Sequence, residues 1–287
     1  MRFLVLGASG MAGHTIALYL KESGHRVSGF SRRPVSFLDA QVNGDAANRA
    51  LLREAIEEGE PDVVVNCIGV LNQFAEADPE AAKWLNGALP HYLADACEGT
   101  RTRVFHMSTD CVFAGNGGPY TEESVPDGES VYDRTKAAGE LRDGRNMTFR
   151  NSIVGPDMNP AGIGLLNWFM QQPGPVRGWT RAMWTGLTTL ELAKAMEAAA
   201  LEGAYGLVNM VPEGNISKFE LLRLFNRELR GGAVEVVPDD AVALDKTLAR
   251  TNFSCSYMPA PYEVQVAELA EWVRAHRELY PHYELGR

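Results

Sequence analysis

The residues Phe3-Leu4-Val5-Leu6-Gly7-Ala8-Ser9-Gly10-Met11-Ala12-Gly13 join a short apolar run to a glycine-rich turn. A continuous apolar run of this length is typical of a strand buried on both faces of a parallel sheet. Beyond the turn, Thr15–Ser23 reads as a helix, because Ile16, Tyr19 and Leu20 recur at the spacing of one helical face. The stretch therefore predicts a strand, a tight turn and a helix in immediate succession.

Three glycines, Gly7, Gly10 and Gly13, occupy this turn with the spacing GxxGxxG. Glycine is needed where a chain turns tightly and where its backbone must approach a pyrophosphate, and the N-terminus of the following helix attracts the phosphates. Such a pattern often marks an ordinary turn, but here it lies between a strand and a helix, the context that nucleotide binding requires. We therefore predict a dinucleotide site at this turn.

Apolar runs and amphipathic stretches alternate along the first half of the chain. The predicted strands are His25–Phe30, Asp62–Ile68 and Arg103–Ser108, and the predicted helices are Ala47–Glu58, Pro79–Cys97 and Ser130–Arg142. Alternation of this kind implies right-handed crossovers between parallel strands. It predicts an α/β fold with a Rossmann-like, doubly wound parallel sheet.

The pattern loosens after about residue 152. Residues 156–175 are rich in Gly, Pro and Asn, as in a substrate-facing insertion. Three further helices are predicted at Thr188–Glu202, Ser217–Leu229 and Val264–His276. We expect residues 1–152 to form the dinucleotide-binding domain and residues 153–287 mostly a smaller, substrate-binding lobe, with segments around 183–210 returning to the first domain.

Composition narrows the range of partners. The 287 residues are 45% hydrophobic and 22% charged, the balance of a globular protein, and their formal net charge is −10. This acidity argues against binding to nucleic acids or anionic membranes, which requires a basic face. No apolar run approaches the roughly 18 residues that a membrane-spanning helix needs.

The four cysteines, Cys67, Cys97, Cys111 and Cys255, form neither a CxxC pair nor a cluster with histidine. Their spacing argues against a disulfide framework and against a zinc site. The N-terminal residues turn into glycines too early for a secretory signal. We therefore expect reduced thiols, a cytoplasmic location and no metal ligands.

The predicted second strand ends in Phe30-Ser31-Arg32-Arg33, where an NAD-binding chain normally carries an acidic residue for the ribose. The guanidinium groups of Arg32 and Arg33 suit a 2′-phosphate, so the sequence favours NADPH, with NADH as the alternative. A solvated pair of surface arginines would look the same. Asp45 could accept a hydrogen bond from adenine, or it could cap an ordinary loop.

A second pattern is Tyr132-Asp133-Arg134-Thr135-Lys136, in a predicted helix. Residues four apart share a helix face, so the Tyr132 phenol and the Lys136 ammonium would point into one space, and the ammonium would lower the pKa of the phenol. Ser108-Thr109-Asp110 ends the preceding strand, where doubly wound sheets bind ligands. A hydroxyl there could hold a carbonyl oxygen that Tyr132 protonates. Each pattern alone occurs on helix surfaces or in caps, but the combination is specific.

Together these motifs resemble the extended short-chain dehydrogenases/reductases, and within them the dTDP-4-dehydrorhamnose reductase-like group. The residues that carry the resemblance are the glycine turn, Asn66-Cys67-Ile68-Gly69, Ser108-Thr109-Asp110-Cys111-Val112-Phe113, Pro119-Tyr120-Thr121-Glu122-Glu123, Tyr132 to Glu140 and, more loosely, Trp184 to Thr189. The register is good from residue 1 to about residue 155, and the match is thin in the last third of the chain.

The resemblance implies roles for individual residues. Thr109 would bind the substrate carbonyl, Tyr132 would donate the proton, and Lys136 would hold the nicotinamide ribose and tune Tyr132. Asp110 would lie beside the sugar, and Asn86 matches a site-facing asparagine, although a position on the helix surface suits it equally. The implied cofactor contacts are Gly7, Ser9, Gly10, Met11 and Gly13 at the pyrophosphate, and Cys67 and Gly69 near the nicotinamide ribose.

Three positions depart from the family pattern. Cys111 replaces a Tyr, Asp133 replaces a Gly, and Ile153 stands where a Trp usually touches the sugar. The cofactor and the hydride chemistry are compatible with these changes. The identity of the sugar is not fixed by the residues that remain.

Trp179, Arg181 and Trp184 lie in the region where this group holds its nucleotide sugar. An aromatic face and a guanidinium would suit a base and a diphosphate. Packing of the smaller lobe explains the same residues equally well.

The sequence and the resemblance predict an NADPH-dependent reductase of a keto group on a nucleotide-linked deoxysugar. The default substrate is dTDP-4-dehydrorhamnose, reduced to dTDP-L-rhamnose for polysaccharide synthesis, and UDP- or GDP-linked keto sugars are the nearest alternatives. Two other classes share the fold: an NADP-binding regulatory subunit without turnover, and an epimerase or dehydratase, which usually has the acidic residue that is missing here. A monomer and a homodimer both stay open, as does a dependence on Mg²⁺.

Overall fold

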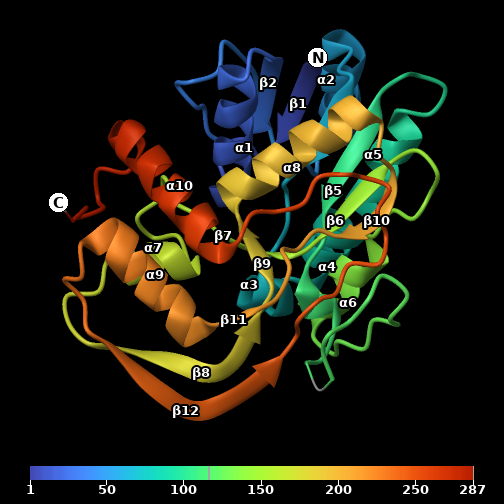
Figure 1. Cartoon of the computed structure of the whole chain (residues 1–287). Helices are drawn as coiled ribbons and strands as arrows, with labels where there is room; N and C mark the ends of the chain where they lie inside the picture. The colour runs from blue at the N-terminus through green and yellow to red at the C-terminus, as the bar shows by residue number, and fades with distance from the viewer. Residues whose placement is uncertain (116, 287) are drawn as a thin grey trace.

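The computed structural model describes residues 1–115 and 117–286. Its centre is a seven-stranded sheet in the order β10-β6-β5-β4-β1-β2-β3, in which every neighbouring pair is parallel (Figure 1). The strands are β1 (Arg2–Leu6), β2 (Arg26–Ser31), β3 (Ala40–Asn43), β4 (Val63–Asn66), β5 (Arg103–Met107), β6 (Met147–Arg150) and β10 (Gly206–Asn209). This topology confirms the predicted doubly wound α/β fold.

Helices cover both faces of the sheet. One layer contains α1 (Met11–Glu22) and α8 (Thr189–Glu202), and the other contains α2 (Arg49–Gly59) and α5 (Leu89–Ala96). Side chains of β1 alternate between them, since Phe3 and Val5 pack in the first layer and Leu4 and Leu6 in the second. The uninterrupted apolar run is thus the pattern of a strand with two buried faces.

The second half of the chain adds a group of elements that Figure 1 shows beside the sheet, around the labels β8, α9 and α10. They are a three-stranded sheet of β8 (Val176–Trp184), β11 (Ile216–Ser217) and β12 (Val236–Asp245), a pair of β7 (Ser152–Val154) with β9 (Gly186–Thr188), and the helices α7 (Leu165–Met170), α9 (Lys218–Arg230) and α10 (Tyr262–Ala275), followed by a short turn η3 (Arg277–Leu279). Phe169, Phe225 and Leu269, one from each helix, meet in a separate apolar core. This second core makes the lobe a packed unit.

Two predicted helices are shorter or less regular than expected. The stretch 79–97 forms α4 (Pro79–Ala82), a π-helical turn η1 (Lys83–Ala88) and then α5. The stretch 130–142 forms only α6 (Val131–Ala138), because α6 packs so closely on η1 that a Cβ on Gly139 would lie 2.0 Å from the Asn86 carbonyl oxygen. The helix therefore ends at a glycine that permits this approach.

Several short elements had no distinct pattern in the sequence, among them α3 (Asn72–Ala77), η2 (Asp110–Val112) and α7. The strands β8 and β12 pair although about sixty residues separate them in the chain, and local periodicity cannot predict such a pairing. Within the described ranges no helix is long and apolar enough to cross a membrane.

Candidate active site

The glycine turn between β1 and α1 has the geometry that requires glycine. Gly7 has a φ of +80°, and its N–H donates a 2.7 Å hydrogen bond to the Phe30 carbonyl of β2. A Cβ on Gly13 would lie only 2.1 Å from the Gly7 carbonyl oxygen. Side chains at these two positions would push α1 away from the turn, so the glycines hold the start of the helix against the strand.

The N-terminus of α1 is open to a ligand. Its N-cap is Gly10, which offers no side chain to the first N–H groups of the helix. These groups face a hollow of about 630 Å³ that Gly7, Ser9 and Gly10 line together with Arg32 and Asp45. An uncapped helix end above a glycine turn suits a pyrophosphate, so the residues present fit a dinucleotide.

The two arginines after β2 differ in position. Arg32 lines the hollow, is 78% exposed at its side chain and lies 4.0 Å from Asp45, whereas Arg33 is exposed and is not part of the lining. A single ion pair at this exposure holds the guanidinium only weakly. Arg32 is therefore the arginine that is free to turn toward a 2′-phosphate.

A second hollow, of about 450 Å³, adjoins the first and shares Gly10, Cys67, Ile68 and Gly69 with it. The predicted residues that line it are Met11, Thr109, Asp110, Tyr132 and Lys136. Met11 begins α1, Thr109 and Asp110 follow the end of β5, and Tyr132 and Lys136 come from α6. With the exception of Gly13 and Arg33, the predicted cofactor residues therefore lie with the predicted catalytic residues in one cleft at the carboxyl ends of the strands.

Tyr132 and Thr109 meet inside this cleft. Both are buried and line the same hollow. Burial raises the pKa of Tyr132 above its usual range, and the neighbouring Cys111 and Asp110 act in the same direction. The expectation of a lowered phenol pKa is therefore wrong for this structure, and Tyr132 keeps its proton.

The position of Lys136 explains why the pKa of Tyr132 is not lowered. Its ammonium donates to the carbonyl of Met107 and lies 3.4 Å from His106 Nε2, so it is turned toward β5. Burial lowers the pKa of Lys136 to about 8, against the opposing effects of Glu140 and Cys67. Burial is the largest cause of the pKa shift of both Tyr132 and Lys136, because the cleft excludes water from each of them.

Asp133, one of the departures from the family pattern, has a local structural role. Its carboxylate accepts a 3.2 Å hydrogen bond from the Ser130 N–H, while the Ser130 hydroxyl accepts from the Asp133 N–H at 3.0 Å. This capping box fixes the start of α6 one residue before Tyr132. The substitution of glycine by Asp133 thus supports the helix that carries Tyr132 and Lys136.

The structure places Asn86 outside the lining of the cleft. It is fully buried in η1, where its side-chain oxygen accepts from the Val70 N–H at 2.8 Å and its amide donates to the Val70 carbonyl at 2.9 Å and to the Thr135 hydroxyl at 3.2 Å. Asn86 therefore joins the loop after β4 to α6. A direct contact of Asn86 with substrate stays a prediction.

Trp179, Arg181 and Trp184 lie along β8, and none of them lines the cleft. Trp179 is 44% exposed, and the Arg181 side chain is also exposed. Trp184 is buried in the second apolar core with Tyr262. Substrate binding by these three residues stays a prediction, and packing accounts for Trp184.

Residues that the sequence did not single out also line the cleft. Asn151 and Ser152 follow β6, and Asp157, Ile163 and Gly164 belong to the stretch that was predicted to face the substrate. No motif marks them individually. Only the composition of residues 156–175 indicated that this segment would reach the site.

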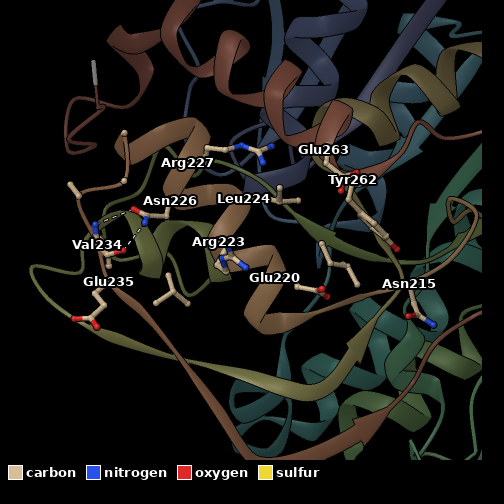
Figure 2. A pocket seen from close by; sticks show the side chains of 15 residues that line it. Asn215, Glu220, Arg223, Leu224, Asn226, Arg227, Val234, Glu235, Tyr262 and Glu263 are labelled. Atoms are coloured by element: carbon tan, nitrogen blue, oxygen red, sulfur yellow. Dashed lines mark hydrogen bonds between the residues drawn. The ribbon is translucent and has the colours of Figure 1, made fainter.

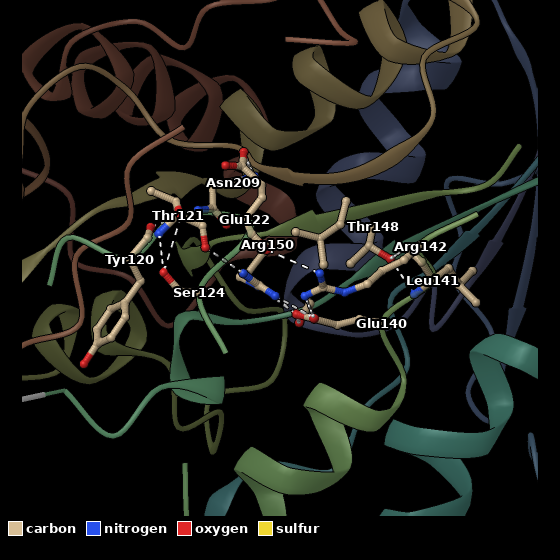
Figure 3. A network of polar contacts seen from close by, with 12 residues as sticks. Tyr120, Thr121, Glu122, Ser124, Glu140, Leu141, Arg142, Thr148, Arg150 and Asn209 are labelled. Atoms are coloured by element: carbon tan, nitrogen blue, oxygen red, sulfur yellow. Dashed lines mark hydrogen bonds and ion pairs between the residues drawn. The ribbon is translucent and has the colours of Figure 1, made fainter. Parts of the chain in front are cut away.

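A buried ionic network surrounds Glu140, and Figure 3 shows it with Arg142 and Arg150. The Glu140 carboxylate accepts from Arg150 Nε at 2.7 Å and Nη2 at 2.6 Å, from Arg142 at 3.1 Å and from the Ser108 hydroxyl at 2.8 Å. Ser108 immediately precedes Thr109, and Glu140 lies four residues after Lys136. The network therefore joins β5, β6 and the end of α6 beneath the cleft. A charged Arg150 inside an apolar strand was the sequence signal that could have revealed it.

A larger hollow, of about 1060 Å³, lies between α9, α10 and the loop that follows α9 (Figure 2). It is lined by Glu220, Arg223 and Arg227, and by Asn226, whose amide is already bonded to both backbone groups of Val234. It contains none of the predicted catalytic or cofactor residues.

In the described part of the chain no three His, Cys, Asp or Glu side chains gather as metal ligands. The cleft at the strand ends is therefore the candidate active site.

Comparisons with known proteins agree with this geometry. The model of the RmlD substrate binding domain family matches residues 1–148. A dTDP-4-dehydrorhamnose reductase of Streptomyces griseus is 38% identical over 141 residues, which are 48% of this chain and 43% of that protein. A dTDP-4-keto-6-deoxy-D-glucose reductase of Streptomyces niveus is 26% identical over 98% of this chain and 96% of its own length.

The fold is shared with a solved structure. The dTDP-4-dehydrorhamnose reductase of Bacillus anthracis, solved in complex with NADP, superposes with a TM-score of 0.78 over 93% of this chain and 98% of its own, at 18% identity. The family match covers more than half of the chain and includes the glycine turn, Thr109, Tyr132 and Lys136. The chain therefore belongs to the RmlD substrate binding domain family, within the sugar-nucleotide reductases of the extended short-chain dehydrogenases/reductases.

Proposed function

We propose that this protein is an NADPH-dependent reductase of the keto group of a nucleotide-linked 4-keto-6-deoxysugar, with dTDP-4-dehydrorhamnose as its first candidate substrate. The observation that carries the proposal is the single cleft in which Thr109, Tyr132 and Lys136 adjoin a glycine turn suited to a pyrophosphate. The reductases named above support the substrate class. The four cysteines are unpaired, which fits a reducing cytoplasm, the compartment that we propose.

The chain's own groups provide acid catalysis and positioning. NADPH, when bound, supplies the hydride for the carbonyl carbon. The Thr109 hydroxyl would hold the carbonyl oxygen beside Tyr132, and Tyr132 would donate its proton to that oxygen as negative charge develops there. Lys136 would hold the ribose hydroxyls and, as an ammonium, favour the phenolate that remains after proton transfer. A phenol whose pKa is raised by burial starts the reaction in the protonated form that this role requires.

The proposal is tested by following NADPH oxidation with a panel of dTDP-, UDP- and GDP-linked 4-keto-6-deoxysugars. Turnover with one of them would establish the reductase and identify the nucleotide. NADPH binding without turnover of any sugar would contradict the proposal and favour a regulatory protein. Light scattering of the same sample distinguishes a monomer from a homodimer.

Replacement of Arg32 should change the choice of cofactor. We expect Arg32→Ala to lower kcat/KM for NADPH by about 10- to 100-fold, because a hydrogen-bonded charge is lost from the 2′-phosphate, and to leave kcat/KM for NADH nearly unchanged. Arg33→Ala is the matched control and should have a smaller effect, since Arg33 does not line the hollow. Equal losses in the two variants would show that the arginines act only through the general charge of the surface.

Cofactor affinity should depend on pH through Lys136. Because the pKa of Lys136 is lowered to about 8, its ammonium is present below that pH and is lost above it. We expect the Kd of NADPH to increase as the pH rises through about 8. In Lys136→Met the affinity should be weaker at neutral pH, and this alkaline loss should be absent. A titration of cofactor fluorescence at several pH values measures both effects, and a flat profile in the native protein would contradict the assignment.

A further inference from the structure

His106 is a fully buried histidine of β5 that contacts Lys136. Its Nε2 atom lies 3.4 Å from Lys136 Nζ, and its Nδ1 atom lies 3.2 Å from the amide nitrogen of Asn66. Asn66 ends β4 and is the neighbour of His106 in the parallel pair of β4 with β5, so both side chains lie on the same face of the sheet. Three buried polar side chains thus follow one another from Asn66 through His106 to Lys136.

The hydrogen bonds of Asn66 decide which nitrogen of the imidazole carries the proton. The Ile68 N–H donates to Asn66 Oδ1 at 3.1 Å, which leaves the amide NH₂ of Asn66 facing His106 Nδ1. Nδ1 must therefore accept, and a neutral imidazole whose Nδ1 accepts carries its proton on Nε2. Burial lowers the pKa of His106 well below its ordinary value, and the charges of Lys136 and His91 act in the same direction, so the imidazole is neutral.

The Nε2–H of His106 consequently faces the side-chain nitrogen of Lys136. That nitrogen already donates to the Met107 carbonyl. A neutral amine keeps a lone pair that can accept from Nε2–H, whereas an ammonium has none, so that two donors face each other at 3.4 Å. A hydrogen bond that only the neutral form can accept disfavours the charged form of Lys136.

The other titratable neighbours of Lys136 act differently. Glu140, one turn later on α6, and Cys67, which follows β4, favour the ammonium, while burial opposes it and lowers the pKa of Lys136 to about 8. Tyr132, one turn earlier on α6, keeps its proton because burial raises its pKa, so it adds no charge. His106 is thus the neighbour from β5 that acts on the amine through an N–H.

We propose that Asn66 and His106 are positioning residues that oppose the ammonium form of Lys136, Asn66 by fixing the imidazole tautomer and His106 by presenting its Nε2–H to the amine. The pair thereby sets the pH at which the cleft loses the positive charge beside Tyr132. The consequence for the cofactor rests on the proposed function: without this pair, the alkaline loss of NADPH affinity should move to higher pH. The protonation of Lys136 itself does not depend on that function.

The test titrates Lys136 in the cofactor-free protein by NMR of lysine labelled with ¹³C at Cε, and the resonance that is missing from Lys136→Met identifies the group. The native midpoint should lie at about 8. In His106→Gln the side-chain amide can turn its oxygen toward Lys136, so we expect the midpoint to rise by about one pH unit, as for one hydrogen bond to a charged group.

Asn66→Leu gives a result whose sign separates the pair from simple burial. Without the Asn66 amide the imidazole can carry its proton on Nδ1 and accept from the ammonium at Nε2, so the midpoint should again rise. If Asn66 acted only by keeping the surroundings polar, an apolar leucine would lower the midpoint instead. His91→Gln is the matched control: it removes an exposed histidine bonded to the Ala138 carbonyl of α6 and should leave the midpoint unchanged.

The outcomes separate this inference from the proposed function. A midpoint that is unchanged or lowered in either folded variant overturns the inference, and turnover of a keto sugar by the native protein then leaves the proposed function in place. Raised midpoints in a protein that turns over no sugar would contradict the proposed function and leave the inference standing. Circular dichroism establishes folding, and where one variant fails to fold the other decides.

Discussion

Tyr132→Phe should reduce kcat for the keto sugar by about 10²- to 10⁴-fold, the usual contribution of a positioned general acid. The substitution removes only the hydroxyl, so the ring keeps its packing in the wall of the cleft. Without that hydroxyl no group at this position can donate a proton to the carbonyl oxygen, and the Thr109 hydroxyl can only hold the oxygen. The effect should fall on kcat more than on KM, since the proton is needed as the oxygen becomes an anion.

The measurement is steady-state NADPH oxidation, accompanied by cofactor binding. The Kd of NADPH should stay close to that of the native protein, because the glycine turn and Lys136 are intact. Tyr19→Phe is the matched control: the Tyr19 hydroxyl donates a 2.7 Å hydrogen bond to Glu197 and lies outside the cleft. A Tyr132→Phe variant as active as this control would remove Tyr132 from the chemistry and leave the fold assignment untouched.

The parts of the site that could be predicted from the sequence depend on local geometry. The glycine turn is specified by backbone sterics over seven residues, and Tyr132 and Lys136 share a helix face because they lie four residues apart. The end of β5 places Thr109 at the carboxyl edge of the sheet, where parallel strands present their ligands. Each of these conclusions needs only the period of a strand or a helix.

The parts that could not be predicted depend on burial and on contacts far apart in the chain. The antiparallel pairing of β11 with β8 joins Ile216 to Trp184 and Ser217 to Met183, and no local pattern specifies this pairing. The raised pKa of Tyr132 depends on how much water the folded cleft excludes, whereas the spacing to Lys136 indicated only the opposing charge. The aromatic and basic residues of β8 attracted a functional interpretation, yet Trp184 is packed in the second core.

Arg150→Met should lower the free energy of unfolding by about 3–5 kcal/mol, the usual cost of removing one partner of a buried ion pair. The side chains of Arg150 and Glu140 are 0% and 1% exposed and are joined by two hydrogen bonds. Methionine fills a similar volume but makes no hydrogen bond. The Glu140 carboxylate then keeps only the Ser108 hydroxyl and Arg142, which is itself half-exposed, as partners. In the unfolded variant, in contrast, water hydrates the Glu140 carboxylate fully. The loss of the ion pair therefore destabilises the folded state.

Urea denaturation of single and double variants separates the pair from the packing around it. If the cost comes from an unpaired buried charge, Glu140→Gln in the Arg150→Met background should recover part of the lost stability, and the two changes should not be additive. Arg177→Met provides the control, because Arg177 is 80% exposed beside Asp239 and its removal should cost no more than about 1 kcal/mol. Equal losses at Arg150 and Arg177 would mean that water reaches the Glu140 carboxylate. In that case the network would not supply the rigid base that joins β5 to α6 beneath the catalytic cleft.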